Sequence, residues 1–490
     1  MPKRLKIVHI ASEVAPFSKT GGLGSVARSL PKALSRLGQE VIIITPLYEK
    51  LIDKKAFKLK PIFSGINLRL NSEEKIRVSY WRGYLLPNLP VYFVECKKFF
   101  SKHRRLYGSS RENARFLVFN VATLKLLSLL KFSADIIQCH DWQTGLIPYY
   151  LKTDFRYSKT LKKAKTIFTI HNLAFQLGHD WWEIPPALKD YGRGKLPHLN
   201  DPRLENINFA KRGILAADFI NTVSEQYRDE IMTKKFGQNL HRILHNRADR
   251  LVGIVNGIDY NIYNPEQDPG LYRHYSFKSP ADRLPNKGYL QKLFDLPERP
   301  AAPIFCMTSR VTFQKGFGLI IAALPRLLEL DAQFIIIGTG EREYIKELQK
   351  MARHYPEKLA VLPTHEANQK YETQVYAGAD FFLLTSNHEP CGINQLIAMR
   401  YGCVPIVRAT GGLSDTVEDF SALRRSGTGF MFKNEGVDDL VGAIGRAIKV
   451  YRRPKVWATL VKRAMQQSNG WEIPAKKYLA LYYKVLEDKR

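Results

Sequence analysis

A chain of 490 residues can bury a large hydrophobic core and predicts two or more domains. Hydrophobic residues make up 45% and charged residues 25% of the chain, as in ordinary soluble globular proteins, and no apolar window of about eighteen residues predicts a membrane span. The N-terminal MPKRLK leads into a strand and not into the apolar region of a signal peptide, so we expect a cytoplasmic protein.

Five cysteines, with no C-x-x-C spacing among them, argue against a disulfide framework or a zinc site. The formal net charge of +29 could indicate nucleic-acid binding. However, the basic residues are spread along the whole chain and match no zinc-finger, basic-zipper or RNP pattern. We therefore do not expect nucleic acid as the main partner, and the short basic clusters are interpreted as solvated surface, among them Lys97–Lys98.

The first predicted elements are a strand, a loop, a helix and a second strand. Leu5–Val14 is apolar and β-branched, as is Val41–Ile44, so both predict buried strands. From Ser25 onward, apolar residues recur at helical spacing. The loop before this helix contains one lysine and three glycines, namely Lys19, Gly21, Gly22 and Gly24.

Two interpretations of this loop stay open at this point. Glycine supplies a positive φ in a tight turn at no steric cost. Alternatively, glycine lets the backbone approach an anion at the helix N-terminus, where Lys19 would add a charge. The spacing matches neither G-x-G-x-x-G nor the P-loop, and the strand ending near Thr45 lacks the acidic residue that holds an NAD ribose, so a dinucleotide cofactor is not expected.

Buried strands alternate with amphipathic helices in both halves of the chain. In the first half, the predicted strands are Leu5–Ser12, Val41–Thr45, Val91–Glu95, Ile136–Cys139, Thr166–Ile170 and Phe219–Val223. In the second half, they are Pro303–Thr308, Ala332–Ile337, Leu359–Leu362, Phe381–Leu384 and Val404–Val407. This alternation predicts an α/β protein with two doubly wound parallel sheets.

We expect the domain boundary near Asp249–Arg250, before the turn-rich stretch Asn256–Gly270. The expected organisation is an N-terminal Rossmann-like domain over residues 1–249, a C-terminal one over 250–469, and a final segment over 470–490. Apolar residues within Trp471–Tyr483 recur at helical spacing and predict a helix in this final segment.

Candidate functional motifs follow the predicted strands. In doubly wound folds, ligands bind outside the carboxyl ends of the strands. The motifs at these ends are the Lys19 loop, HDWQTGL (140–146), HNLAF (171–175), SRVTFQKG (309–316), TSNHEPCGINQ (385–395) and RATGGLSDT (408–416). Two Rossmann-like domains facing one another would gather them in one interdomain cleft.

In number, order and spacing, these segments resemble those of bacterial-type glycogen synthases and plant starch synthases, nearly end to end. The matching segments are KTGGLG (19–24), LYG (106–108), HDWQTGL (140–146), TIHNLAFQ (169–176), NTVSEQYRDEI (221–231), GIVNGID (253–259), SRVTFQKGF (309–317), YAGADFFLLTSNHEPCGINQ (376–395), RYGCVPIVRATGGLSDTV (400–417) and WEIPAKKYLALY (471–482). The resemblance implies the GT-B fold, with two Rossmann-like domains across a cleft, and implies that the final helix returns to the N-terminal domain.

The resemblance also implies a function. Such an enzyme would move glucose from a nucleotide donor, with ADP-glucose favoured, to the non-reducing end of an α-1,4-glucan, with retention of configuration and without a metal or cofactor. Two other hypotheses stay open. One is a related GT-B transferase that uses UDP-glucose or another donor or acceptor, and the other is a non-catalytic glucan-binding protein.

The implied donor site surrounds a diphosphate. Arg310 and Lys315 match the paired cations that the family places on the leaving phosphate, and fixed cations can stabilise that charge without a metal. The other donor ligands implied by the resemblance are Lys19, Gly21, Gly22, Cys391, Gly392, Asn394, Gly411 and Gly412.

The implied catalytic residues are Glu389, His171 and Asp141. Glu389 would favour an oxocarbenium-like transition state, although a glutamate before proline is commonly a turn residue. His171 would lie against the transferred glucose, although alone it reads as a hydrogen-bonded core histidine. Trp142 and Asn256 are the implied acceptor ligands, and Trp142 could equally be a packing residue.

Three departures from the family pattern concern these sites. Gln143 stands where the family usually has a histidine, and Ile393 and Asn394 replace a Leu-Thr pair. Asn394 can still donate a hydrogen bond to phosphate. Ala367 occupies a region where the family often places an aromatic residue near the nucleobase, which leaves the choice between ADP- and UDP-glucose open.

Overall fold

The computed structural model describes residues 3–70, 75–102 and 104–488. The chain divides into two compact units. Unit 1 comprises Met1–Val223, Arg228–Ile254 and Trp471–Arg490, and unit 2 comprises Ser224–Tyr227 and Val255–Gly470. Unit 1 therefore extends past Asp249–Arg250, where we expected the boundary, because the chain first adds one more strand to its sheet.

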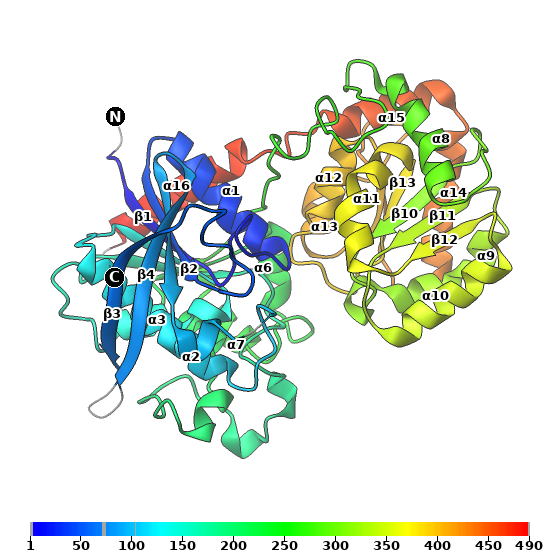
Figure 1. Cartoon of the computed structure of the whole chain (residues 1–490). Coiled ribbons are helices and arrows are strands. Elements are labelled where there is room, and N and C mark those ends of the chain that lie inside the picture. The colour runs from blue at the N-terminus through cyan, green and yellow to red at the C-terminus, as the bar shows by residue number, and fades with distance from the viewer. Residues whose placement is uncertain (1–2, 71–74, 103, 489–490) are drawn as a thin grey trace. The chain divides into compact units, whose positions relative to one another are not determined.

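Unit 1 is built on a nine-stranded sheet with the order β3-β4-β5-β2-β1-β6-β7-β8-β9 (Figure 1). Its strands are β1 Lys6–Ile10, β2 Glu40–Pro46, β3 Lys60–Arg69, β4 Lys75–Leu86, β5 Leu89–Glu95, β6 Ile136–His140, β7 Lys165–Ile170, β8 Phe219–Thr222 and β9 Leu251–Gly253. In the sheet order from β5 through β2 and β1 to β9, all neighbouring strands are parallel. Strand β4 pairs antiparallel with both β3 and β5. The carboxyl ends of β1, β6 and β7 therefore lie side by side.

The α-helices of unit 1 are α1 Gly22–Arg36, α2 Lys97–Phe100, α3 Glu112–Leu129, α4 Leu146–Lys152, α5 Phe209–Ala216, α7 His241–His245 and α16 Glu472–Glu487, and α6 Glu225–Ile231 begins in unit 2 and ends in unit 1. Short 3-10 helices span Trp142–Thr144, Trp181–Glu183, Pro186–Leu188, Pro202–Asn206 and Ala248–Arg250. Helix α1 is amphipathic, and its apolar side is buried at Val26, Leu30 and Leu34, which is the 3.6-residue spacing expected from the sequence.

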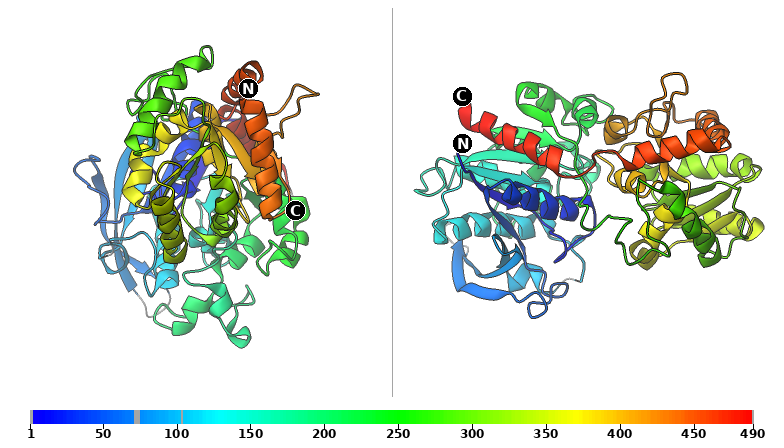
Figure 2. Two further views of the ribbon diagram at one scale, coloured as in Figure 1. Left: turned by 90° about the vertical axis from the view of Figure 1, so that its right-hand side faces the viewer. Right: turned by 90° about the horizontal axis from the view of Figure 1, so that it is seen from above.

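Helix α16 packs on unit 1. The Asn221 side-chain amide donates to the Tyr478 hydroxyl at 3.0 Å, and the Tyr482 hydroxyl hydrogen-bonds the Gln138 side chain. Near the end of the helix, Arg250 pairs with the Asp488 carboxylate at 2.8 Å. Figures 1 and 2 show α16 lying beside α1. The last element of the chain thus completes the layer of helices on the sheet formed by the first half.

Unit 2 is built on a six-stranded, fully parallel sheet with the order β12-β11-β10-β13-β14-β15. Its strands are β10 Ile304–Thr308, β11 Gln333–Ile337, β12 Leu359–Leu362, β13 Phe381–Leu384, β14 Val404–Arg408 and β15 Phe430–Phe432. Its helices are α8 Leu284–Leu293, α9 Phe317–Leu328, α10 Arg342–His354, α11 His365–Gly378, α12 Asn394–Arg400, α13 Gly411–Thr416, α14 Val437–Tyr451 and α15 Pro454–Met465, with 3-10 turns at Pro280–Arg283 and Phe313–Lys315.

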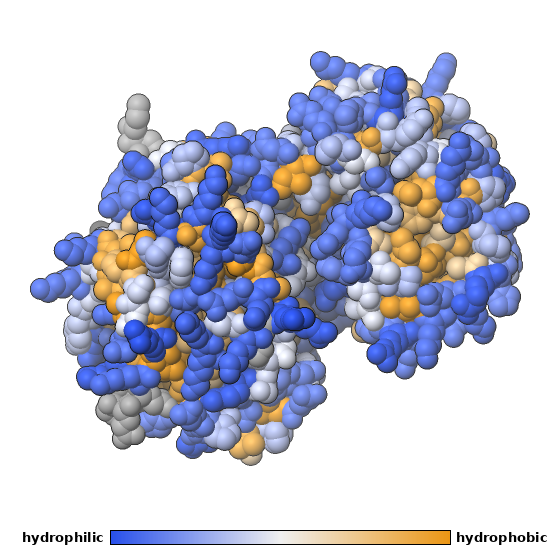
Figure 3. Space-filling model, in the orientation of Figure 1, coloured by the Kyte–Doolittle hydropathy of each residue, from blue (hydrophilic) through white to orange (hydrophobic). Residues whose placement is uncertain are grey.

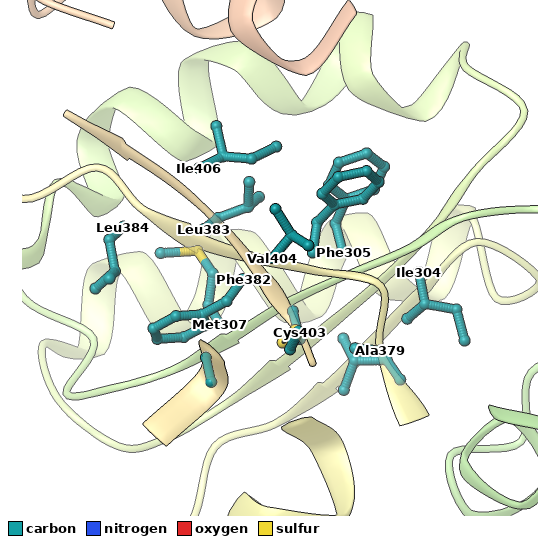
Figure 4. Packing of buried hydrophobic residues seen from close by; sticks show 14 of the residues in the cluster. Ile304, Phe305, Met307, Ala379, Phe382, Leu383, Leu384, Cys403, Val404 and Ile406 are labelled. Carbon is teal, nitrogen blue, oxygen red and sulfur yellow. Dashed lines mark hydrogen bonds between the residues drawn. The ribbon is translucent and has the colours of Figure 1, made fainter. Parts of the chain in front are cut away.

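The core of unit 2 is an apolar cluster around β10, β13 and β14 (Figure 4). The Phe305 ring stacks on the rings of Phe334 and Phe381, with centroids 5.2 and 4.9 Å away. All three side chains are buried. Burial of an aromatic side chain of this size contributes about 1.5–3 kcal/mol. The packing therefore fixes β10, β11 and β13 against one another, and the carboxyl ends of β10 and β13 carry two motifs of the second half.

Every strand expected from the sequence occurs, and the prediction of two doubly wound α/β sheets is confirmed. Strands β3, β4, β9 and β15 have no counterpart among the strands predicted from the sequence. Strands β3 and β4 lie at the sheet edge. Most residues of β3 are exposed or half-buried, and the first part of β4 alternates between exposed and buried positions, so neither forms a continuous apolar run. Strands β9 and β15 have three residues each, too few for a periodic signal.

The surface and the cysteines agree with the composition. Hydrophilic residues cover most of the face in Figure 3. All five cysteines are free and buried. Among the described residues, no helix combines the length and apolar character needed to cross a bilayer.

A buried ion pair ties α8 to the sheet of unit 2, and it gives a stability prediction. The Asp380 carboxylate accepts hydrogen bonds from Lys287 Nζ at 2.8 Å and from the Ile304 backbone N–H at 2.9 Å, and the side chains of Lys287 and Asp380 are only 6% and 4% exposed. Replacement of Asp380 by Asn leaves the buried Lys287 ammonium without a counter-charge. We expect the free energy of unfolding of unit 2 to fall by about 3–5 kcal/mol, measured by urea denaturation with near-UV circular dichroism.

The matched control is Asp438→Asn. Asp438 pairs with Arg326, but their side chains are 89% and 50% exposed, so we expect a change within about 1 kcal/mol. Equal losses in the two variants would contradict a special role for the buried pair.

Candidate active site

A buried carboxylate organises the glycine-rich loop of unit 1. Glu13 follows β1 and is 2% exposed. Its carboxylate accepts hydrogen bonds from the Thr20 backbone N–H at 2.6 Å, the Thr20 hydroxyl at 2.8 Å and the Gly24 backbone N–H at 3.1 Å. Burial raises the pKa of Glu13, and these hydrogen bonds act in the opposite direction. One side chain thus holds both ends of the loop.

The tip of this loop faces solvent. Lys19, Gly21 and Gly22 are exposed, and Gly21 is the N-cap of the 15-residue helix α1, which has no acidic residue in its first turn. A helix N-terminus presents backbone N–H groups and a partial positive charge, to which Lys19 adds a full charge. The structure therefore brings together the three loop residues implied as diphosphate ligands, in an arrangement that suits an anion.

Three histidines form a hydrogen-bonded row across unit 1. His9 Nδ1 lies 3.0 Å from His140 Nε2, and His140 Nδ1 lies 2.9 Å from His171 Nε2. His9 and His140 are 0% exposed, whereas His171 is partly exposed. Burial lowers the pKa of His9 and of His171 to about 3 and lowers that of His140 well below its usual value. All three rings are consequently neutral near neutral pH.

Asp141 holds the backbone at His171. Its carboxylate accepts the His171 backbone N–H at 2.7 Å and also hydrogen-bonds the backbone of Asn172. Asp141 has φ = 57°, a left-handed conformation that is costly for a residue with a side chain and that tends to cluster at functional sites. Burial raises the pKa of Asp141 to about 7, and the charge of Glu13 acts in the same direction. The two catalytic residues expected in unit 1, Asp141 and His171, are therefore in direct contact.

Trp142 does not present a stacking surface. Its side chain is 5% exposed and packs edge-on against Phe116 and Phe209, with centroids 5.2 and 6.1 Å away. This burial favours the packing alternative and removes Trp142 from the implied acceptor ligands.

In unit 2, the candidate site centres on Glu389. The carboxylate is 6% exposed and accepts hydrogen bonds from Lys315 Nζ at 2.5 Å and from the Ser386 hydroxyl at 3.0 Å. Lys315 ends the 3-10 turn after β10, and Glu389 follows β13, so the pair joins the ends of neighbouring strands. This contact fixes the Lys315 ammonium and the Glu389 carboxylate against each other. A glutamate that served only as a turn residue would not need such a partner.

The turn that carries Lys315 lies directly on the end of β13. Gly316 has φ = 74°, and a Cβ there would stand 2.0 Å from the Thr385 carbonyl oxygen. Only glycine fits this close approach. Arg310, at the start of the same connection, is exposed. The structure therefore puts one exposed and one anchored cation after β10.

The glycine pair after β14 packs against the loop of Glu389. The Gly412 backbone N–H donates to the Glu389 carbonyl oxygen at 3.0 Å, and a Cβ on Gly412 would stand 2.1 Å from the Cys391 carbonyl oxygen. The Gly412 amide is thus engaged within unit 2, and its role in this structure is close packing. Gly392 has φ = 67°, as a turn before α12 requires.

Two further expected ligands are engaged within unit 2. Asn394 Nδ2 donates to the Thr308 carbonyl oxygen at 2.8 Å and lies 3.3 Å from the Glu372 carboxylate. Asn256 is 3% exposed and hydrogen-bonds Cys391. Asn394 thus holds the end of β10, and Asn256 contacts the residue that follows Pro390. Ala367 is buried in the first turn of α11 and offers no aromatic surface.

Several residues that shape these sites are not among those predicted from the sequence. They are Glu13, His9, His140, Ser386, Glu372 and Arg408. The Arg408 guanidinium donates to the Ser386 carbonyl oxygen at 2.9 Å and to the Asn387 carbonyl oxygen at 2.6 Å, which clamps the loop before Glu389. An acidic residue at the end of an apolar strand was the available signal for Glu13, but nothing in the sequence distinguishes His9 from a core histidine.

Comparison with known families covers most of the chain. Residues 6–246 match the starch synthase catalytic domain family, and residues 291–463 match the glycosyl transferases group 1 family. The chain is 38% identical to a glycogen synthase of Anoxybacillus flavithermus, covering 98% of this chain and 97% of that protein. It is also 38% identical to glycogen synthase 2 of Geobacter sulfurreducens, covering 99% of this chain and 100% of that protein.

Solved structures give the same relationship. The catalytic domain of starch synthase IV from Arabidopsis thaliana, bound to ADP and acarbose, superposes with a TM-score of 0.87 at 30% identity, covering 99% of this chain and 100% of that one. A sucrose-phosphate synthase from Thermosynechococcus elongatus shares the fold, with a TM-score of 0.62 at 16% identity. The expected GT-B fold class is thus confirmed, and the chain belongs to the glycogen synthase and starch synthase family of glycosyltransferases.

Proposed function

We propose that this enzyme transfers glucose from ADP-glucose to the non-reducing end of an α-1,4-glucan, with retention of configuration. The single observation that carries the proposal is the anchored Lys315–Glu389 pair at the carboxyl ends of β10 and β13. Full-length similarity to glycogen synthases supports the reaction, and the ADP in the starch synthase IV structure supports the choice of base.

In this proposal, unit 2 binds the nucleotide sugar. Transfer breaks the bond between the anomeric carbon and the diphosphate oxygen, so negative charge develops on the leaving group. Arg310 and Lys315 would stabilise that charge, and the exposed Lys19 loop with its helix N-terminus would contact the same diphosphate. Lys315 needs little reorganisation because Glu389 already holds its ammonium.

Glu389 would act on the sugar. As the bond to the leaving group breaks, the ring gains oxocarbenium character, and a fixed carboxylate stabilises this positive charge. The hydrogen bond from Ser386 and the contact with Lys315 keep that carboxylate in place. In unit 1, His171 would lie against the transferred glucose, and Asp141 would contact hydroxyls of the acceptor, so this unit would carry the acceptor side.

The first test is Glu389→Gln. Glutamine keeps the shape of the side chain and can still hydrogen-bond Lys315 and Ser386, but it removes the charge. If the charge stabilises the transition state, kcat should fall by about 10²-fold or more while the KM for ADP-glucose changes little. Initial rates of ADP release with glycogen measure both constants, and near-normal turnover by the folded variant would remove Glu389 from the catalytic residues.

The second test concerns the cations. Arg310→Ala is the cleaner substitution, because Arg310 is exposed, whereas Lys315→Ala would leave the buried Glu389 without its partner. Loss of one charge-assisted contact to the leaving group should cost about 2–4 kcal/mol of transition-state stabilisation, measured as kcat/KM for ADP-glucose. The double variant Lys97→Ala/Lys98→Ala changes the net charge elsewhere in the chain. Equal losses in both proteins would indicate that diffuse charge, and not a site, attracts the donor.

The same assay decides the donor. With glycogen as acceptor, we expect kcat/KM for ADP-glucose to exceed that for UDP-glucose. Preference for UDP-glucose would retain the glucan synthase and correct the base. Absence of transfer from either donor, in a protein that still binds glycogen, would instead support the non-catalytic alternative.

Asp141 gives a pH prediction. Its pKa is 3.8 in the unfolded reference and about 7 in the fold, so between these values the folded protein holds a proton that the unfolded chain does not. The free energy of unfolding should therefore fall as pH rises through this window and level off above about pH 7. Asp141→Asn lacks this titration, while the histidines titrate in both proteins and cancel. As pH rises through the window, the free energy of unfolding of the wild type, measured in urea, should therefore fall relative to that of the variant. The total fall should be about 1.4 kcal/mol for each pH unit between the two pKa values. A difference that is constant from pH 4.5 to pH 7.5 would contradict it.

A further inference from the structure

The histidine row has a direction. Each neutral imidazole has one N–H and one lone pair, so the row can donate either from His9 toward His171 or the other way. Donation from His9 Nδ1 leaves the lone pair of His9 Nε2 at the buried end. Donation from His171 Nε2 would instead leave an N–H there.

The buried end of the row selects between these two arrangements. His9 Nε2 is buried and has no hydrogen-bond partner among the described residues. A buried N–H without an acceptor is rarer in folded proteins than an acceptor with an unused lone pair. The favoured arrangement therefore has the proton on Nδ1 of His9 and of His140, and both donate toward the surface.

The direction of the row also fixes which nitrogen of His171 carries the proton. Its Nε2 accepts from His140 Nδ1, so the proton of the neutral ring must reside on Nδ1. The Asp141 carboxylate fixes the backbone of the same residue at 2.7 Å. Of the three histidine residues, His171 is the one that is partly exposed.

We propose that His9 and His140 are positioning residues that fix the Nδ1–H tautomer of His171, so that His171 acts as a hydrogen-bond donor to a sugar hydroxyl and not as a proton acceptor. This inference rests on the proposed function for its sugar ligand, but the tautomer is a property of the row alone. An imidazole held in one tautomer and orientation pays no cost to reorganise when the ligand binds.

The first experiment reads the tautomer directly. With ¹⁵N-histidine-labelled protein, long-range ¹H–¹⁵N spectra distinguish a protonated Nδ1 from a protonated Nε2, and single substitutions assign the signals. We expect the Nδ1–H form for His9, His140 and His171 at pH 7. An Nε2–H signal from His171 in the wild-type protein would overturn the proposal, whether or not the protein transfers glucose.

The second experiment compares two substitutions of His140. Asparagine places an amide nitrogen where Nδ1 stood and can still donate to His171, whereas phenylalanine keeps a ring but cannot donate. His140→Phe should release the tautomer of His171 and lower kcat by about tenfold or more, with a smaller effect on the KM for ADP-glucose. His140→Asn should keep the Nδ1–H signal of His171 and most of kcat.

Two results would contradict a positioning role. One is unchanged kcat and an unchanged His171 signal in His140→Phe. The other is an equal loss of kcat in both variants that follows an equal loss of stability in urea, because this would indicate packing alone. A wild-type protein with the expected tautomer but no glucosyl transfer would refute the proposed function and leave the direction of the row intact.

Discussion

Parallel strand pairing is the constraint on which both sites depend. It aligns the carboxyl ends of β1, β6 and β7 in unit 1 and of β10, β13 and β14 in unit 2. Residues far apart in sequence, such as His9 and His140 or Lys315 and Glu389, thereby come within hydrogen-bond distance. The antiparallel hairpin β3–β4 lies at the far edge and takes no part in this alignment. Apolar packing beneath the strands holds these ends in place.

Charged groups buried at those ends must be paired, and their hydrogen bonds fix the loops and side chains of the two sites. Glu13 takes three hydrogen bonds from the loop that it organises, and Glu389 takes two from side chains of unit 2. Each loses hydration on burial, so removal of a partner costs stability. Asp141 extends this pattern, because its left-handed backbone and raised pKa are costs that the fold bears at a position proposed to be functional.

Most of the fold followed from periodicity. Long apolar runs such as those of β1 and β10 predict buried strands, and helical spacing of apolar residues predicts α1 and the final helix. The missed strands are short or half-exposed, and their pairing partners, not their own sequence, make them strands. The packing side of α16 came from family resemblance, and its contacts with Asn221 and Gln138 supply the physical reason.

The sequence by itself determined the fold class, the family and the principal charged residues, because motif spacing and apolar periodicity are local properties of the chain. Tertiary structure alone decided which side chains meet. It removed Trp142 from the acceptor ligands by burying it between Phe116 and Phe209, and it engaged the Gly412 amide with the Glu389 carbonyl. It also joined His9 to His171 through His140. Contacts of this kind depend on strand order and burial, which no local pattern of residues encodes.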